Sequence, residues 1–215
     1  MSKTFKPFGL KPAYHPSGLD RAVPFIGTNT FANGTDYSAP YLLNAGEAFY
    51  QYTPVGINSS GQLIVATGAI YGSFDGVEFT DSQGRRSVSK WASATTLAAS
   101  TDIVFWIFAD PVLVYEAQVN GPAPTGAIGS EYDFSAAVGY TATGGYSIGN
   151  GGAGFSTTAL AATPVTSGTQ GQVRVVGLGR EVAYPAGESN TWGDDYTIVQ
   201  VQISNNAFTA PSVSV

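Results

Sequence analysis

Apolar and polar residues alternate along much of the chain after Tyr41, which predicts strands with one buried face. In one such stretch, Val77 and Phe79 fall on the same face. The run Ile103–Phe108 is apolar on both faces and predicts a central strand. Further stretches of strand character are Gln62–Ala66, Val112–Val119, Gln172–Val176 and Tyr196–Ile203, the last with Val199, Val201 and Ile203 facing in and Gln200 and Gln202 facing out.

A β-hairpin is predicted between residues 76 and 91. Asp81–Gly84 supplies the turn, with Gly84 placed for a left-handed residue and a bulge. Arg85 and Arg86 then lie at the tip, and Lys90 follows beside Trp91. Three interpretations of these cations stay open: a solvated tip, a contact with an acidic protein, or a contact with nucleic acid.

The 27 glycines and 12 prolines indicate many turns, and the only helical pieces we expect are short, around residues 91–99 and 156–162. Residues 120–172 are rich in Gly, Ala, Ser and Thr and predict a loop-heavy stretch. The sequence therefore predicts an all-β protein, an antiparallel sandwich or barrel-like body in one domain over residues 35–215.

Residues 1–34 predict an extended arm. Pro7, Pro12, Pro16 and Pro24 disfavour a helix, and the segment is basic before the first acid. We expect this arm to reach a partner, and its removal up to Pro16 to leave a folded body. The candidate contact residues of the arm are Lys3, Phe5, Lys6, Phe8 and Lys11.

Composition narrows the partners. The net charge of −6 disfavours a nucleic-acid surface, because phosphate binding needs a basic face. Only 11% of residues are charged, against about 25% usually, so either other protein covers much of the surface or Ser, Thr, Asn and Gln solvate it. No apolar run is long enough to cross a membrane, and the first residues lack a secretory pattern, so we expect synthesis in the cytoplasm.

Candidate chemistry is sparse. The chain has no cysteine, and its one histidine, His15, lies in the arm. A calcium site at Asp75, Glu78 and Asp81 is one alternative, and the G-x-G-x-x-G match at residues 149–154 lacks the strand and helix that a dinucleotide site needs. The carboxylate pairs considered for glycoside hydrolysis are Asp75 with Glu78, Glu131 with Asp133, and Asp194 with Asp195. We predict no catalytic, cofactor or metal site.

Four groups of residues in the middle and end of the chain form a pattern. They are Gly72, Phe74, Gly76, Phe79, Thr80, Asp81 and Gly84; Asp110, Pro111, Tyr115, Glu116 and Gln118; Val173, Arg174, Val175, Gly177 and Leu178; and Val199, Val201, Ile203 and Asn205. In these positions the chain resembles a family of small head proteins of tailed bacteriophages. The likeness covers roughly residues 45–210. The chain departs from the family pattern at Lys90–Ala92, and the basic arm has no counterpart in it.

The resemblance implies a virion structural role. Together with the low charge, it leads us to expect a capsid decoration or cement protein on the outer surface of the phage head. Such a protein would bind the major capsid protein, bridge capsomers and form a homotrimer or dimer. On this hypothesis Arg85, Arg86, Lys90 and Trp91 contact a neighbour. The alternative is a carbohydrate-binding module of a tail or fibre, with Tyr132, Tyr140, Tyr146 or Trp192 stacking on sugars.

Overall fold

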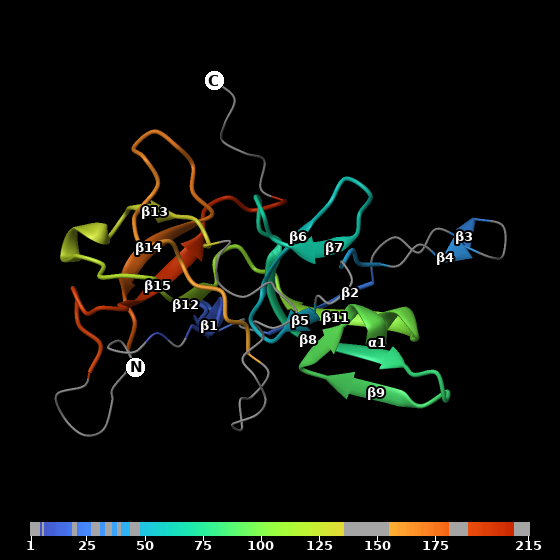
Figure 1. Cartoon of the computed structure of the whole chain (residues 1–215). Helices are drawn as coiled ribbons and strands as arrows, with labels where there is room; N and C mark the ends of the chain where they lie inside the picture. Colours follow the sequence, from blue (N-terminus) through green and yellow to red (C-terminus); the bar gives the residue numbers. More distant parts are fainter. Residues whose placement is uncertain are drawn as a thin grey trace.

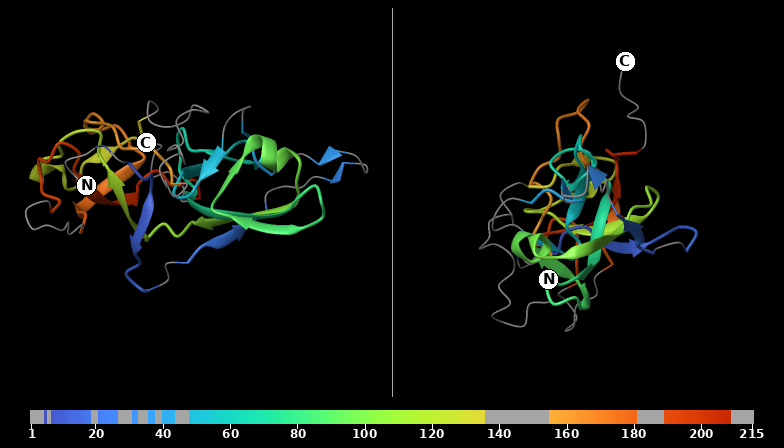
Figure 2. Two further views of the ribbon diagram at one scale, coloured as in Figure 1. Left: turned by 60° about the horizontal axis from the view of Figure 1, so that its bottom comes forward. Right: turned by 90° about the vertical axis from the view of Figure 1, so that its right-hand side faces the viewer.

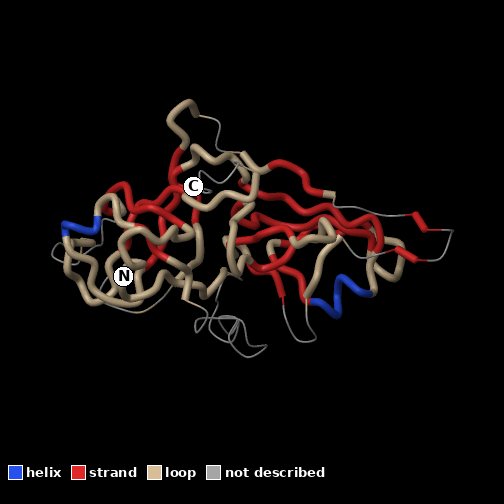
Figure 3. The backbone as a smooth tube through the Cα atoms, turned by 90° about the horizontal axis from the view of Figure 1, so that it is seen from above, coloured by secondary structure: helices blue, strands red, loops and turns tan. Residues whose placement is uncertain are grey.

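The computed structural model describes residues 5, 7–18, 21–26, 31–32, 36–37, 40–43, 48–135, 155–180 and 189–208. The chain is mostly β, as predicted, and its antiparallel sheets pack together in a sandwich-like, elongated body (Figures 1 and 3). No helix in the described residues could cross a membrane. The strands are β1 (Lys11–Tyr14), β2 (Val23–Phe25), β3 (Phe31–Ala32), β4 (Asp36–Tyr37), β5 (Ala48–Tyr50), β6 (Pro54–Ile57), β7 (Leu63–Val65), β8 (Gly72–Thr80), β9 (Arg86–Ser89), β10 (Trp91–Ser93), β11 (Thr101–Phe108), β12 (Val114–Gln118), β13 (Glu131–Tyr132), β14 (Val173–Leu178) and β15 (Ile198–Ile203); the helices are α1 (Ala94–Ala98) and the 3-10 turn η1 (Thr125–Ala127).

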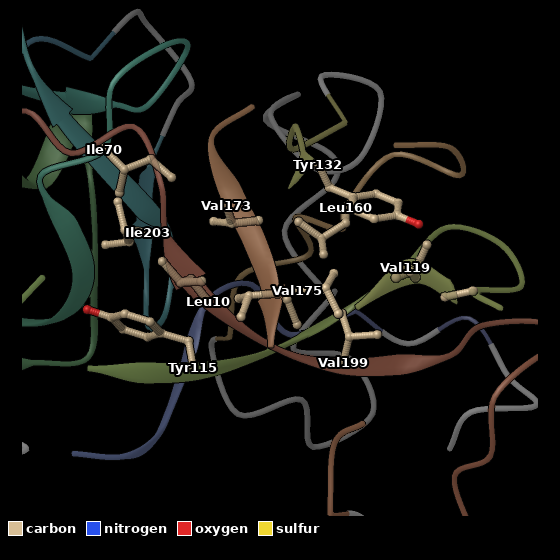
Figure 4. Close-up of a cluster of buried hydrophobic side chains, with 14 of the residues drawn as sticks. Leu10, Ile70, Tyr115, Val119, Tyr132, Leu160, Val173, Val175, Val199 and Ile203 are labelled. Carbon is tan, nitrogen blue, oxygen red and sulfur yellow. The ribbon is translucent and has the colours of Figure 1, made fainter. Parts of the chain in front are cut away.

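The first large sheet has the strand order β1-β12-β15-β14-β13. Its inner face is built by the predicted alternation: Val199 and Val201 are fully buried, whereas the intervening Gln200 pairs with Glu116 on the other face. The inner side chains form one hydrophobic core with Tyr132 and Leu160 (Figure 4).

The second large sheet has the order β2-β11-β8-β6-β7, and β9 also pairs with β8. Its inner face carries Phe74 and Phe105, which are fully buried. A second layer, made of the β5–β10 ribbon and α1, covers this face. Phe49 of β5 stacks on Phe74 at 5.5 Å between ring centroids and meets Phe105 edge-on at 5.5 Å. This sheet therefore has a core of its own.

The predicted arm runs along both sheets as an edge. Strand β1 pairs with β12, and β2 pairs with β11 (Figure 2). Because β11 and β12 follow each other in sequence but lie in different sheets, the N-terminal segment spans the boundary between them. Pro12 and Pro24 sit in these edge strands, where a missing N–H is tolerated. The boundary expected between residues 34 and 35 falls outside the described residues.

Leu10 lies where the two sheets meet. It is fully buried in the first core, its N–H donates to the Tyr52 carbonyl at 2.7 Å, and its own carbonyl accepts from Ser73 Oγ at 2.5 Å. Figure 4 shows its side chain near Tyr115 and Ile203. The segment after Gly9 is thus part of the body.

A second connection joins the sheets through residues 68–70. The Ile70 N–H donates to the Asn205 carbonyl at 2.8 Å, and the Gln172 Nε2 donates to the Gly68 carbonyl at 2.7 Å. These hydrogen bonds tie loops of the second sheet to the ends of β14 and β15, so the sheets are connected on both sides of Leu10.

The predicted helix over 156–162 is wrong, whereas the helix expected within 91–99 is present as α1. Leu160 forms isolated β-bridges with Val119 and Phe134, so this segment is extended against the first sheet. The Ser156 hydroxyl accepts from the Thr158 N–H at 3.2 Å, a local bond that competes with a helix. The glycine-rich stretch 149–154 and the rest of 136–154 lie outside the described residues.

Candidate protein-interaction surface

The β8–β9 hairpin has the geometry that its turn residues predict. The Gly84 N–H donates to the Asp81 carbonyl at 2.9 Å, and the Asp81 N–H donates to the Arg85 carbonyl at 2.9 Å. Gly84 is left-handed, with a φ of 75°. The Asp81 carboxylate accepts from the backbone N–H groups of Gln83 and Arg85 at 2.8 and 2.9 Å. The turn is therefore fixed by its own backbone and by one acid.

Each cation of the hairpin is paired with an acid of the same hairpin. Arg85 lies 2.9 Å from Asp81, Arg86 lies 2.8 Å from Glu78, and Lys90 Nζ lies 2.8 Å from Asp75. All three cationic side chains are exposed, so each pair contributes little to stability by itself. The cluster is nevertheless neutralised from within, and a contact of these cations with an acidic neighbour stays a prediction.

Arg86 reaches across three strands. Its Nε donates to Glu78 on β8, and its NH1 donates to the Asp102 carbonyl at 3.1 Å, where β11 begins. Asp102 has a φ of 50° and lies at an irregularity of the β8–β11 register. Its carboxylate accepts from the Thr80 hydroxyl at 3.2 Å. The guanidinium of Arg86 is therefore held in place over the outer face of the sheet.

The pKa of Asp81 lies below its ordinary value. The backbone N–H of Arg85 lowers the pKa of Asp81, against the effect of burial, and the Arg85 side chain and the Gln83 N–H lower it further. The carboxylate therefore stays ionised into mildly acidic solution, where it continues to hold the turn.

Most of the acids considered for glycoside hydrolysis or for calcium are bonded to other groups of the chain itself. Asp75, Glu78 and Asp81 each form an ion pair with a basic side chain of the hairpin. No group of three or more metal-binding side chains occurs in the described part of the chain. Asp133 accepts from the Gln172 N–H at 3.0 Å. Asp194 accepts from the Thr191 N–H at 2.9 Å.

Glu131 accepts three hydrogen bonds from different parts of the first sheet. It accepts from Ser204 Oγ at 2.5 Å, the Gly171 N–H at 2.6 Å and Arg174 NH2 at 2.7 Å. Burial raises the pKa of Glu131, but the hydrogen bonds from Ser204, Gly171 and Arg174 outweigh it and hold the pKa below its usual range. The ionised carboxylate thus fastens β13 to β14 and to the residues around Gly171 and Ser204.

We expect Glu131→Gln to lower the free energy of unfolding by about 1–3 kcal/mol at pH 7, because the amide places an NH₂ group against donors. A depressed native pKa stabilises above the unfolded value of about 4.3, and this contribution disappears as pH falls through the native value. Urea unfolding at pH 7 and pH 3 should show the difference shrinking at pH 3. Glu78→Gln, in an exposed pair, is the control and should change stability by less than about 1 kcal/mol.

His15 fastens the N-terminal segment to the β11–β12 connection. Its side chain is only 6% exposed, and its Nε2 lies 3.2 Å from Asp110 Oδ2. Its Nδ1 accepts from the Ser17 N–H at 2.9 Å, which places the proton of the neutral ring on Nε2. Within the described residues Nε2 makes no hydrogen bond, so its approach to Asp110 is a close contact only. The one histidine of the chain therefore has a neighbouring group of the fold at each of its ring nitrogens.

The described arm residues that we expected to meet a partner contact the body itself. Phe5 packs on Tyr196 at 5.1 Å between ring centroids. Lys11 Nζ lies 5.8 Å from the centroid of the Phe8 ring and 3.8 Å from Glu116 Oε2. Lys3 and Lys6 lie outside the described residues. A contact of these arm residues with a partner stays a prediction.

Several apolar side chains are exposed; Trp91 was named from the sequence as a contact residue, whereas Val88 and Phe208 were not. The side chain of Val88 is 73% exposed on the outer face of β9. Its two neighbours along the strand are serines, and both are less exposed. Phe208 is 70% exposed and meets Tyr71 edge-on at 5.1 Å. Trp91 is 39% exposed and stacks on Tyr50 at 6.3 Å. A valine between two serines in the predicted hairpin was the available signal for Val88.

No protein-family model matches the chain, and neither a curated protein nor a solved structure matches it.

The aromatic residues named for sugar stacking differ in how far their rings are exposed. Tyr132 is 1% exposed and offers no open ring, whereas Trp192 is partly buried against the first core. Tyr140 and Tyr146 lie outside the described residues.

Proposed function

We propose that the protein is a virion structural protein that binds the capsid lattice of a tailed bacteriophage and stabilises the head by bridging neighbouring capsomers. The observation that carries the proposal is the resemblance over residues 72–118 and 173–205, together with the positions of its residues. Gly84 forms the hairpin turn, and Phe74, Tyr115 and Val201 lie in the two cores. These positions shape a rigid body, which is what a lattice-binding protein requires.

The surface chemistry supports adhesion to protein. The hairpin cations are neutralised by their own acids, so a neighbour can cover them without leaving a buried charge unpaired. Exposed apolar side chains such as Val88 and Phe208 gain from such covering. A ligand that binds the assembled lattice and not its free subunits stabilises the lattice by mass action, by about 2.7 kcal/mol per site at 100 times its Kd.

The test is binding to purified heads of a phage that lacks the gene for this chain. We expect saturable co-sedimentation with the heads, at an occupancy fixed by the number of capsomers, and a higher temperature of head disruption. Isolated capsid subunits are the control and should bind more weakly. Heads that remain bare at saturating protein would refute the proposal, and binding to a glycan array in their place would favour the carbohydrate-binding alternative.

A further inference from the structure

In the part of the chain that the structure describes, no strand pairs with the outer edge of β9. In the β8–β9 hairpin, Asp81 and Arg85 form the first hydrogen-bonded pair. Hydrogen-bonded and non-hydrogen-bonded pairs alternate in an antiparallel ladder, so the next hydrogen-bonded pairs are Phe79 with Ser87 and Val77 with Ser89. The backbone N–H and C=O groups of Arg86 and Val88 therefore point away from β8. Within the described residues, β8 is the one strand that pairs with β9, and Figure 1 draws β9 at the margin of the sheet.

The other edges of the two large sheets are blunted or covered. Pro12 and Pro24 interrupt the outer edges of β1 and β2. Residues 40–42 cover β7, through hydrogen bonds from the Leu63 N–H to the Pro40 carbonyl and from the Leu42 N–H to the Leu63 carbonyl. Residues 161–165 cover β13, where the Val165 N–H donates to the Glu131 carbonyl at 2.9 Å.

We propose that β9 is a self-association edge, and that a second copy of this chain adds its own β9 antiparallel to it across a two-fold axis. A two-fold contact is self-complementary, so both copies use the same residues. With the axis at Ser87, Arg86 lies opposite Val88 of the second copy and Val88 lies opposite its Arg86. These two pairs form four backbone hydrogen bonds between the copies.

Charge favours this register. An axis at Val88 would place Arg86 opposite Lys90 of the second copy, and like charges directly opposite are destabilising. With the axis at Ser87, each Val88 packs on the aliphatic part of the opposite Arg86. The guanidinium of that Arg86 is already held by Glu78 and the Asp102 carbonyl, so it needs no new partner when the contact forms. The 73% exposed Val88 is the side chain that gains burial.

The backbone is tested with Val88→Pro, and Val88→Thr is the matched control. Proline removes an N–H that points outward, so the ladder to β8 is kept, whereas two of the four intermolecular hydrogen bonds are lost. We expect the dimer Kd measured by sedimentation equilibrium to rise about 10- to 100-fold for Val88→Pro and to change less than about threefold for Val88→Thr. Circular dichroism of the variants should keep the wild-type β spectrum and melting temperature.

The register is tested separately with Ser87→Cys, which is a clean probe because the chain has no cysteine of its own. The Ser87 pair has its Cα atoms about 4.5 Å apart in this register, within reach of a disulfide. Oxidation should convert Ser87→Cys to a covalent dimer at least tenfold faster than Gln83→Cys, at the exposed turn. A wild-type chain that stays monomeric at millimolar concentration would overturn the proposal, as would equal cross-linking of the two variants or an oligomer indifferent to Val88→Pro. The proposal does not depend on capsid binding, so either can fail alone.

Discussion

Leu10→Ala should lower the free energy of unfolding by about 2–5 kcal/mol, the range for emptying a fully buried leucine site. Leu10 is 0% exposed, although it lies in the segment that the sequence predicts to be an arm. The Gly9 N–H donates to the Thr158 carbonyl and the Leu10 N–H donates to the Tyr52 carbonyl, so the backbone is held and cannot easily collapse into the space that is left. Urea unfolding followed by circular dichroism measures the change.

Leu42→Ala is the matched control, because the same side chain is 53% exposed at that position and its loss should change stability by about 0.5 kcal/mol or less. If the two leucine variants unfolded alike, residues 9–14 would not be part of the body. The same reasoning changes the expectation for deletion of residues 1–16. That deletion removes Leu10, β1 and His15 together, so we now expect an unstable body rather than a folded one.

Gly72→Ala should lower the free energy of unfolding by about 3 kcal/mol or more, because a Cβ at this position would meet backbone that cannot move aside easily. The added atom would lie 2.2 Å from the Phe108 carbonyl oxygen and 2.9 Å from Ile107 Cγ2. Strands β8 and β11 would have to separate at the centre of the second sheet. Thermal unfolding and the yield of folded protein both report the effect.

Gly68→Ala is the control for this variant, since a Cβ there has nothing within 4 Å and the residue does not have a positive φ. Its stability should stay the same or rise by up to about 1 kcal/mol. Equal stability of the two alanine variants would show that β8 and β11 do not approach as closely as described. Gly72 is also a position of the phage-protein resemblance, and this contact gives a physical reason why that pattern has glycine there.

The turn of the β8–β9 hairpin is determined by its own residues, whereas the ion pairs of the hairpin are not. The positions of Asp81 and Gly84 predicted the turn, its left-handed residue and its bulge, because turn conformation depends on the few residues within it. The alternation of Val199 and Val201 with glutamines predicted the apolar face of β15, but Gln200, which we expected to face out, is also buried. The roles of the hairpin cations needed the register: Arg86 meets Glu78 because those residues are neighbours across two strands, and nothing in their spacing along the chain fixes that pairing.

The predictions that failed or changed concern long-range contacts. Residues 156–162 have a composition that allows a short helix, but Leu160 is fully buried between Val119 and Phe134, and an extended segment serves that contact better. The N-terminal prolines correctly indicate an extended backbone. They do not indicate that the segment pairs with β12 and then with β11, because an extended edge strand and a free arm share the same local pattern.

The sequence was enough to predict an all-β chain. Period-two alternation and turn residues are signals that depend on a few neighbouring residues, and the scarcity of charge can be read from the composition alone. The division into two cores, the docking of Leu10 between them and the internal pairing of Arg85, Arg86 and Lys90 arise in the folded chain alone. They depend on which strands become neighbours, and that choice follows from burying many side chains at once rather than from any one stretch of residues.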